Sequence, residues 1–118
     1  MEAAVLDFSI RQGASFLLGF VWMDVTEAPN DISECIVRMQ VRPYPGSKKI
    51  FLEASTTNER IYFGENPGEF WLDLDPTVTA AIDWRRGKYD IELQYPDGGV
   101  IPIIGGTITV TLEVTRNG

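Results

Sequence analysis

Residues 87–116 read GKYDIELQYPDGGVIPIIGGTITVTLEVTR and carry the clearest β-strand signal in the chain. The pattern predicts two strands, over residues 88–95 and 106–114, joined by a turn at 96–99 and a short apolar segment at 100–104. In the second strand apolar residues (Ile108, Val110, Leu112, Val114) alternate with polar ones (Thr107, Thr109, Thr111, Glu113). A period of two predicts one face buried in a core and one face in water.

Short alternating segments separated by turn-forming residues recur through the rest of the chain. They predict further strands over residues 6–10, 15–24, 35–42, 49–55, 60–63 and 69–74, with loops at 26–33 and 43–47. Turns spaced about eight to twelve residues apart are typical of a sandwich or a barrel. No segment has the βαβ pattern of a parallel sheet.

One short helix is predicted, over residues 75–82. Asp75 can cap its N-terminus, and Pro76 suits the first helical position, where the missing N–H is not needed. The segment is too short to be stable alone. We therefore expect a crossover between two sheets, with Val78, Ile82 and Trp84 directed at the core.

Gly87 and Tyr89 follow this crossover at the start of a late strand. The arrangement resembles the tyrosine corner of immunoglobulin-like sandwiches, in which a Tyr hydroxyl bonds back to the backbone upstream. Tyr89 is predicted to hold such a corner; the alternative is that it is an ordinary strand residue at an interface. Gly105 and Gly106 predict a β-bulge. The whole pattern predicts an all-β fold: one domain, residues 1–118, forming an immunoglobulin-like antiparallel β-sandwich of about 7–9 strands with one crossover helix.

Composition argues against several classes of function. The 118 residues include no histidine, which removes the usual general base near neutral pH and the commonest transition-metal ligand. The formal net charge of −7 argues against binding to a nucleic-acid backbone. The single cysteine, Cys35, cannot form an internal disulfide and is interpreted as a buried structural thiol rather than a reactive one. The N-terminal residues do not form a signal-peptide pattern, and no apolar run has membrane-spanning length, so neither secretion nor a membrane partner is expected.

The search for chemical motifs is negative. The densest acidic set is interpreted as a solvated face and a helix cap rather than as a calcium site: Glu65, Glu69, Asp73, Asp75 and Asp83. No pair of carboxylates is singled out for glycoside hydrolysis, and no serine lies in a nucleophile elbow. The glycine-rich turns match no phosphate-binding motif. The expectation is a protein without catalytic residues, metal or cofactor.

Residues 16–23 are apolar on both faces of the predicted strand, so the strand is either central in a sheet or covers a contact surface. The candidate contact residues are Leu17, Val21 and Met23 in this strand, Tyr44 and Pro45 in the loop that follows the next strand, and Tyr62 and Trp71 further on. The exposed aromatics are interpreted as interface anchors or as scattered surface residues, with stacking on sugars as a further alternative. The first and last strands are the candidate edges for assembly.

Four segments taken together resemble a family of small β-sandwich structural proteins of tailed bacteriophages: residues 10–16 (IRQGASF), 38–42 (RMQVR), 87–93 (GKYDIEL) and 105–116 (GGTITVTLEVTR). The resemblance covers nearly the whole chain, and its motifs are structural rather than chemical. It implies a virion protein, made in the host cytoplasm, that serves as a tail, neck or baseplate adaptor or attaches a fibre. It implies as partners other virion proteins, including portal or capsid proteins, and a homo-oligomeric ring or multiple copies. The alternatives are a capsid decoration protein and a carbohydrate-binding module that attaches to a host glycan.

Overall fold

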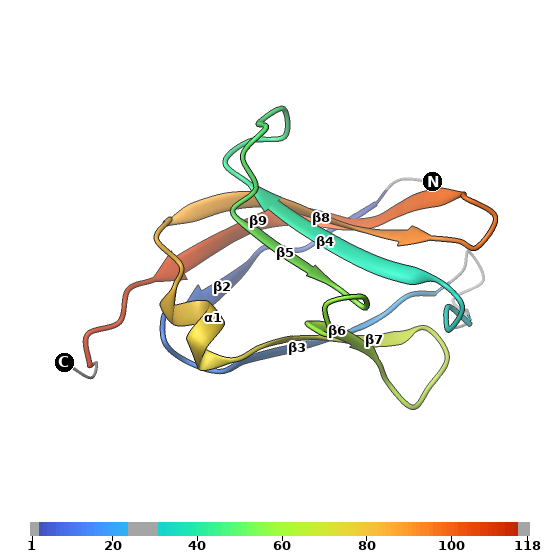
Figure 1. Cartoon of the computed structure of the whole chain (residues 1–118), viewed down its shortest axis with the longest axis horizontal. Helices are drawn as coiled ribbons and strands as arrows, with labels where there is room; N and C mark the ends of the chain where they lie inside the picture. The colour runs from blue at the N-terminus through green and yellow to red at the C-terminus, as the bar shows by residue number, and fades with distance from the viewer. Residues whose placement is uncertain (1–2, 24–30, 116–118) are drawn as a thin grey trace.

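A computed structural model of the chain describes residues 3–23 and 31–115 (Figure 1). In this part of the chain nine strands and one helix follow in the order β1 (Ala4–Val5), β2 (Phe8–Arg11), β3 (Phe16–Val21), β4 (Ile36–Arg42), β5 (Leu52–Ser55), β6 (Ile61–Phe63), β7 (Glu69–Leu74), α1 (Pro76–Ala80), β8 (Arg86–Gln94) and β9 (Val100–Thr111). The predicted all-β class and the strand number are confirmed.

The strands form two layers, the larger sheet above the smaller one in Figure 1. The large sheet has the order β1-β9-β8-β4-β5, with β2 also paired to β9, and the small sheet has the order β3-β7-β6. The predicted sandwich is confirmed, but it is not wholly antiparallel, because β1 and β2 both run parallel to β9. Alternation of apolar residues is the same in both directions of pairing, so the sequence pattern does not distinguish them.

The core lies between the two sheets and is built from alternate residues of each strand. In β7 the predicted phase is confirmed, because Phe70, Leu72 and Leu74 are fully buried. Met39 of β4 and Ile91 of β8 are fully buried on the facing sheet. The thiol of Cys35 also lies in this core, as predicted.

The crossover helix is shorter than predicted but is capped as the sequence indicates. The Asp75 carboxylate accepts a hydrogen bond of 3.0 Å from the Val78 amide, and Pro76 begins the helix. Thr79 fixes the helix to the turn after β2 by donating to the Ala14 carbonyl oxygen at 2.8 Å. The chain then passes from the small sheet to the large one, and Ile82 and Trp84 are buried as expected.

The apolar segment at 100–104 is not separate from the last strand, contrary to the prediction from the sequence pattern. β9 runs without interruption through Gly105 and Gly106, and the segment at 100–104 belongs to it. The bulge lies elsewhere: Ile91 and Glu92 of β8 pair with Ile104 and Pro102, which leaves Ile103 as the extra residue. β8 begins at Arg86, two residues before the predicted start, so Gly87 lies inside the strand, and a side chain there would approach Val41 to 2.6 Å.

The predicted burial of β9 holds for Ile108 and Val110 and fails at its C-terminal end. Leu112 is 42% exposed and Val114 is 86% exposed, because β9 and its partner strands end by Thr111. Thr107 is buried although it was assigned to the outer face, and its hydroxyl accepts a hydrogen bond from the Lys88 ammonium at 2.7 Å. β9 is also not an edge strand, because β8 flanks one side and β1 and β2 flank the other.

Tyr89 holds the N-terminal strands rather than a corner of the β7–β8 crossover. Its hydroxyl donates a hydrogen bond to the carbonyl oxygen of Leu6, which lies 83 positions earlier in the chain. The ring is buried and meets the Phe8 ring edge-on, with 5.1 Å between centroids. The usual corner bond reaches only a few residues upstream. The prediction of a tyrosine corner is therefore wrong, although Tyr89 does form a long-range anchor.

The anchor predicts a loss of stability in alkali. Burial, and to a smaller extent the nearby Asp7 carboxylate, raise the pKa of Tyr89 from 10.0 to about 12. Because the folded protein favours the neutral phenol, this stabilisation is complete below pH 10.0 and is lost as the pH rises toward about 12. Urea unfolding of the wild type should show an extra loss of up to about 2.5 kcal/mol over this range, relative to Tyr89→Phe. Parallel pH profiles of the two proteins would contradict the expectation.

Candidate functional site

The outer face of the small sheet gathers five of the seven predicted contact residues. Leu17 and Val21 of β3 and Met23, which follows it, share one face of that segment and are 57%, 51% and 47% exposed. Trp71 of β7 pairs with Gly19 of β3 on one side and with Tyr62 of β6 on the other. We call the set the small-sheet face: Leu17, Val21, Met23, Tyr62 and Trp71.

Trp71 lies at the centre of this face and is fixed in place. A side chain at Gly19 would approach the six-membered part of the indole to 2.8 Å, so the ring lies directly over that glycine. The indole N–H donates to the Glu69 carboxylate at 2.9 Å, and the Asn66 side-chain amide donates to the same carboxylate at 2.9 Å. These hydrogen bonds, that of Trp71 first, lower the pKa of the Glu69 carboxyl from its ordinary value. The carboxylate stays charged and holds the indole.

The apolar character of both faces of residues 16–23 does not come from a central place in a sheet. β3 is an edge strand of the small sheet, so the central alternative is wrong. Its inward residues pack on the core, and Phe20 stacks on Phe70 at 5.0 Å. Its outward residues form part of the small-sheet face. Gly19 is the position of the candidate site that the sequence pattern missed, because its contact with the Trp71 ring depends on strand pairing.

Tyr44 and Pro45 do not join the small-sheet face. They lie in the β4–β5 loop, which projects from the large sheet on the opposite side of the sandwich (Figure 1). Tyr44 is 61% exposed. The two segments that were predicted to contribute to the contact therefore lie on different sides of the sandwich, and the contribution of Tyr44 and Pro45 stays a prediction.

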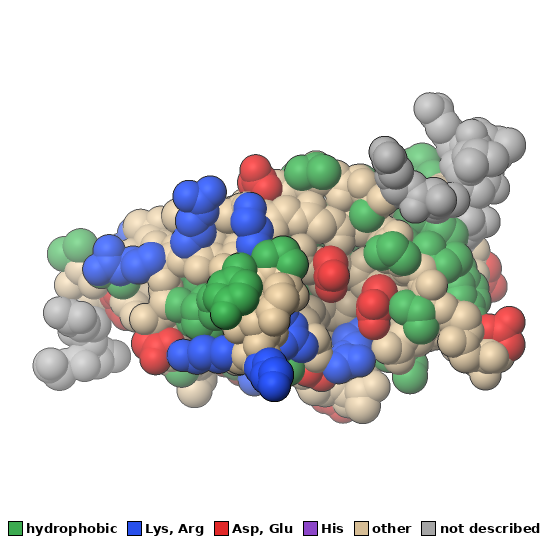
Figure 2. Space-filling model, turned by 90° about the horizontal axis from the view of Figure 1, so that it is seen from above, with side chains coloured by type: hydrophobic (Ala, Val, Ile, Leu, Met, Phe, Trp, Pro, Cys, Tyr) green, Lys and Arg blue, Asp and Glu red, His purple; other side chains and the backbone are tan. Residues whose placement is uncertain are grey.

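The outer face of the large sheet is polar. A groove of about 230 Å³ is lined by charged residues of both signs together with Gln40, Pro45 and Tyr89; the charged ones are Arg38, Arg42, Lys88, Asp90 and Glu92. Viewed from this side, basic and acidic side chains are interspersed with small hydrophobic patches (Figure 2). Burial, and then the charge of Glu92, raise the pKa of Asp90, an effect that Arg42 opposes.

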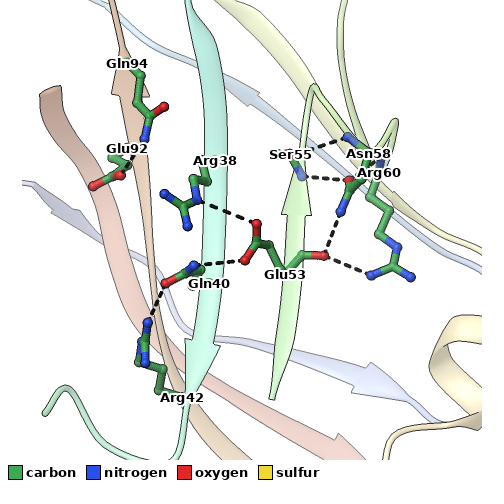
Figure 3. A network of polar contacts seen from close by, with 9 residues as sticks. All are labelled: Arg38, Gln40, Arg42, Glu53, Ser55, Asn58, Arg60, Glu92 and Gln94. Atoms are coloured by element: carbon green, nitrogen blue, oxygen red, sulfur yellow. Dashed lines mark hydrogen bonds and ion pairs between the residues drawn. The ribbon is translucent and has the colours of Figure 1, made fainter. Parts of the chain in front are cut away.

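One ion pair and several hydrogen bonds to uncharged groups hold charged side chains of this face (Figure 3). Glu53 accepts from Gln40 at 2.9 Å and lies 3.7 Å from the Arg38 guanidinium. Arg42 donates to Gln40 at 2.8 Å and to the Ser47 carbonyl oxygen at 2.6 Å, which braces the β4–β5 loop. These contacts fix the Arg38, Arg42 and Glu53 side chains on the outer face of the large sheet.

No protein-family profile matches the sequence, and none of the curated proteins compared with it is similar.

The acidic residues and the cysteine that were considered for chemistry from the sequence have structural surroundings. Asp75 caps α1, and Glu69 holds Trp71, which accounts for two of the five acids considered from the sequence. Across residues 3–23 and 31–115, no three His, Cys, Asp or Glu side chains gather as a metal site would require. Burial, followed by the nearby Glu34 and Asp31 carboxylates, raises the pKa of the Cys35 thiol and keeps it in the unreactive form. In the same ranges no helix has the length and apolar character needed to cross a membrane.

Proposed function

We propose that this protein is a non-enzymatic structural subunit that docks through its small-sheet face onto a larger protein assembly. The observation that carries the proposal is the convergence of four exposed side chains, from β3, the residues that follow it and β6, around a fixed Trp71 of β7. Trp, Tyr and Met are enriched at the centres of protein interfaces, where an immobilised aromatic loses little entropy on binding.

The rim of the face indicates the character of the partner. Within the ladder, Leu17 pairs with Asp73 and Val21 pairs with Glu69, so carboxylates border the apolar centre. The chain as a whole carries a formal charge of −7. A complementary partner surface is apolar at its centre and basic at its edge, because charges of opposite sign steer encounter and fix orientation.

For the identity of that assembly, the sequence resemblance supports a tailed-bacteriophage virion. We propose a tail, neck or baseplate adaptor, or a fibre-attachment component, present in several copies. In the alternative role, as a capsid decoration protein, the same face would bind the lattice of capsid proteins. A sandwich without a metal cluster among its described residues, and with one aromatic-rich sheet face, fits a permanent structural contact.

The proposal is tested by incorporation of variants into virus particles. Trp71→Ala should lower the affinity for the particle by about thirtyfold or more, as expected for loss of a central interface aromatic. Particles produced without the wild-type protein are incubated with a concentration series of purified variant, and the bound fraction is measured after sedimentation. Tyr44→Ala is the matched control, since it truncates an exposed aromatic on the opposite side of the sandwich.

Equal binding by wild type, Trp71→Ala and Tyr62→Ala would contradict the proposal. Melting temperatures of the variants show that each remains folded. A loss caused by Tyr44→Ala and not by Trp71→Ala would move the contact to the large-sheet side.

One observation favours a second candidate, a carbohydrate-binding module. Tyr62 and Trp71 are direct cross-strand neighbours, and adjacent aromatic rings on a flat sheet can stack on sugar rings. A glycan array probed with the same proteins separates the two candidates. Glycan binding by the isolated protein that disappears in Trp71→Ala would favour the second.

A further inference from the structure

One edge of the small sheet is open. β3 pairs with β7 along one side, and no strand of the described chain pairs with its other side. In an antiparallel pair, backbone N–H and C=O groups of alternate residues point toward the partner strand and away from it. The Trp22 amide donates to the Gly68 carbonyl oxygen at 2.9 Å, so the even-numbered residues form the hydrogen-bonded pairs with β7. The N–H and C=O groups of Leu17, Gly19 and Val21 therefore point to the open edge.

This edge lacks the features that normally block strand addition. Charged residues, proline, bulges and very short length are the usual protections. β3 reads FLLGFV, with neither charge nor proline, and it pairs with β7 without a register shift. The other outer strands are protected: β1 has only two residues, β2 carries Arg11, β5 carries Glu53, and β6 has only three residues.

We propose that the open edge of β3 pairs with β3 of a second copy of this chain, antiparallel and about a two-fold axis at Gly19. In this register Gly19 faces Gly19 of the second copy, and Leu17 faces Val21 of the second copy on each side of the axis. The three outward-pointing residues then form hydrogen-bonded pairs, giving about six backbone hydrogen bonds. The two small sheets become one continuous sheet.

The strand is complementary to itself in this register. Every side chain along the seam is apolar: Leu17 lies opposite Val21, and on the core side Leu18 lies opposite Phe20. In antiparallel pairing about a two-fold axis each residue meets the residue at the mirror position, so here apolar side chains meet apolar side chains. Glycine at the axis leaves room on the outer face for the Trp71 indole of each copy, which already lies over Gly19. The half-exposed Leu17 and Val21 would lose water on both sides of the axis.

The dimer deepens the proposed function by naming a second copy as one partner, yet the two can fail separately. Dimerisation is measured on the purified protein alone, and docking is measured on particles. In the dimer the small-sheet faces of both copies lie side by side on one surface, which doubles the area presented to a larger assembly.

The first test is the mass in solution. Sedimentation equilibrium over a concentration series should show conversion of the 13.2 kDa chain to a species of twice that mass. Val21→Lys should raise the dimer dissociation constant by about tenfold or more, because it places a charge in both symmetry-related contacts. Within its own chain position 21 lies opposite Glu69, so the introduced ammonium is tolerated by the fold.

Val100→Lys is the matched control. Val100 begins β9 in the other sheet and is 52% exposed, against 51% for Val21, so both changes place lysine at an equally exposed valine. The control should dimerise like the wild type. A wild type that stays monomeric at every concentration, or a dimer that both variants weaken equally, would overturn the proposal.

The second test reads the register. Paired Cα atoms in a hydrogen-bonded antiparallel pair are about 5.5 Å apart, within reach of a disulfide. Mild oxidation of the double variant Leu17→Cys with Val21→Cys should give a covalent dimer, since each position faces the other across the axis. Leu17→Cys alone should not cross-link, because the Cα atoms of the two copies of position 17 lie about 14 Å apart. Cys35 is buried and adds no background. Equal cross-linking by the single and the double variant would rule out this register.

Discussion

Phe70→Ala is expected to lower the free energy of unfolding by about 3–5 kcal/mol, the range for removing a fully buried aromatic ring. Phe70 has no exposed surface and lies on β7, the central strand of the small sheet. Its ring stacks on that of Phe20 with 5.0 Å between centroids and 15° between planes. Truncation leaves a cavity between the sheets that the flanking strands cannot close. Urea unfolding followed by tryptophan fluorescence measures the loss.

Tyr62→Ala is the control for this truncation. Tyr62 lies on the neighbouring strand of the same sheet but on its outer face, where it is 42% exposed. The loss there should stay below about 1 kcal/mol. Similar losses in the two variants would show that the core is not where the structure puts it.

Gly106→Ala is expected to destabilise the protein by about 3 kcal/mol and to release the N-terminal strands. A methyl group at Gly106 would overlap the Leu6 carbonyl oxygen and lie 2.8 Å from an Asp7 carboxylate oxygen. The Leu6 oxygen belongs to the backbone, so the β1–β2 connection must move away. The move breaks three hydrogen bonds, each worth about 1 kcal/mol: Tyr89 to Leu6, Leu6 to Gly105, and Thr107 to Asp7.

The neighbouring glycine provides the control. A methyl group at Gly105 would meet the Tyr89 carbonyl oxygen at 3.4 Å, an ordinary contact, so Gly105→Ala should change stability by less than about 0.5 kcal/mol. Hydrogen exchange adds a local measurement: the Leu6 and Thr107 amides should lose protection in Gly106→Ala and keep it in Gly105→Ala. Unchanged protection in both variants would contradict the assigned role of Gly106.

The sequence predicted the parts of the fold that depend on local pattern. β7 was obtained to the residue, because Phe70, Leu72 and Leu74 alternate without interruption. The cap at Asp75 follows from the residue types alone. The continuous β9 was missed, because Gly105 and Gly106 read as a break until the crossing of Leu6 above them is known. The anchor of Tyr89 depends on a contact 83 positions away, which no local pattern encodes.

The sequence indicated individual residues of the candidate site but not which of them lie together on one surface. Leu17, Val21 and Trp71 stand out in the sequence because they are large, apolar and out of phase with the core. Their union depends on the register that sets Trp71 beside Gly19 and Tyr62. Tyr44 has the same residue-level signal and lies on the other side of the sandwich. The sheet from which a loop projects is decided by the topology of the whole fold and cannot be read from the sequence of the loop.

The parallel pairing of β2 with β9 has a mechanical consequence. β2 is near the start of the chain and β9 near its end, and the two strands are joined at four successive positions from Phe8–Ile108 to Arg11–Thr111. Tension that enters before β2 and leaves after β9 pulls the two strands lengthwise in opposite directions. All bonds of the ladder then carry the load together in shear, instead of opening one at a time as in a peeled hairpin. A subunit of this topology transmits axial force through a ladder that is loaded in shear.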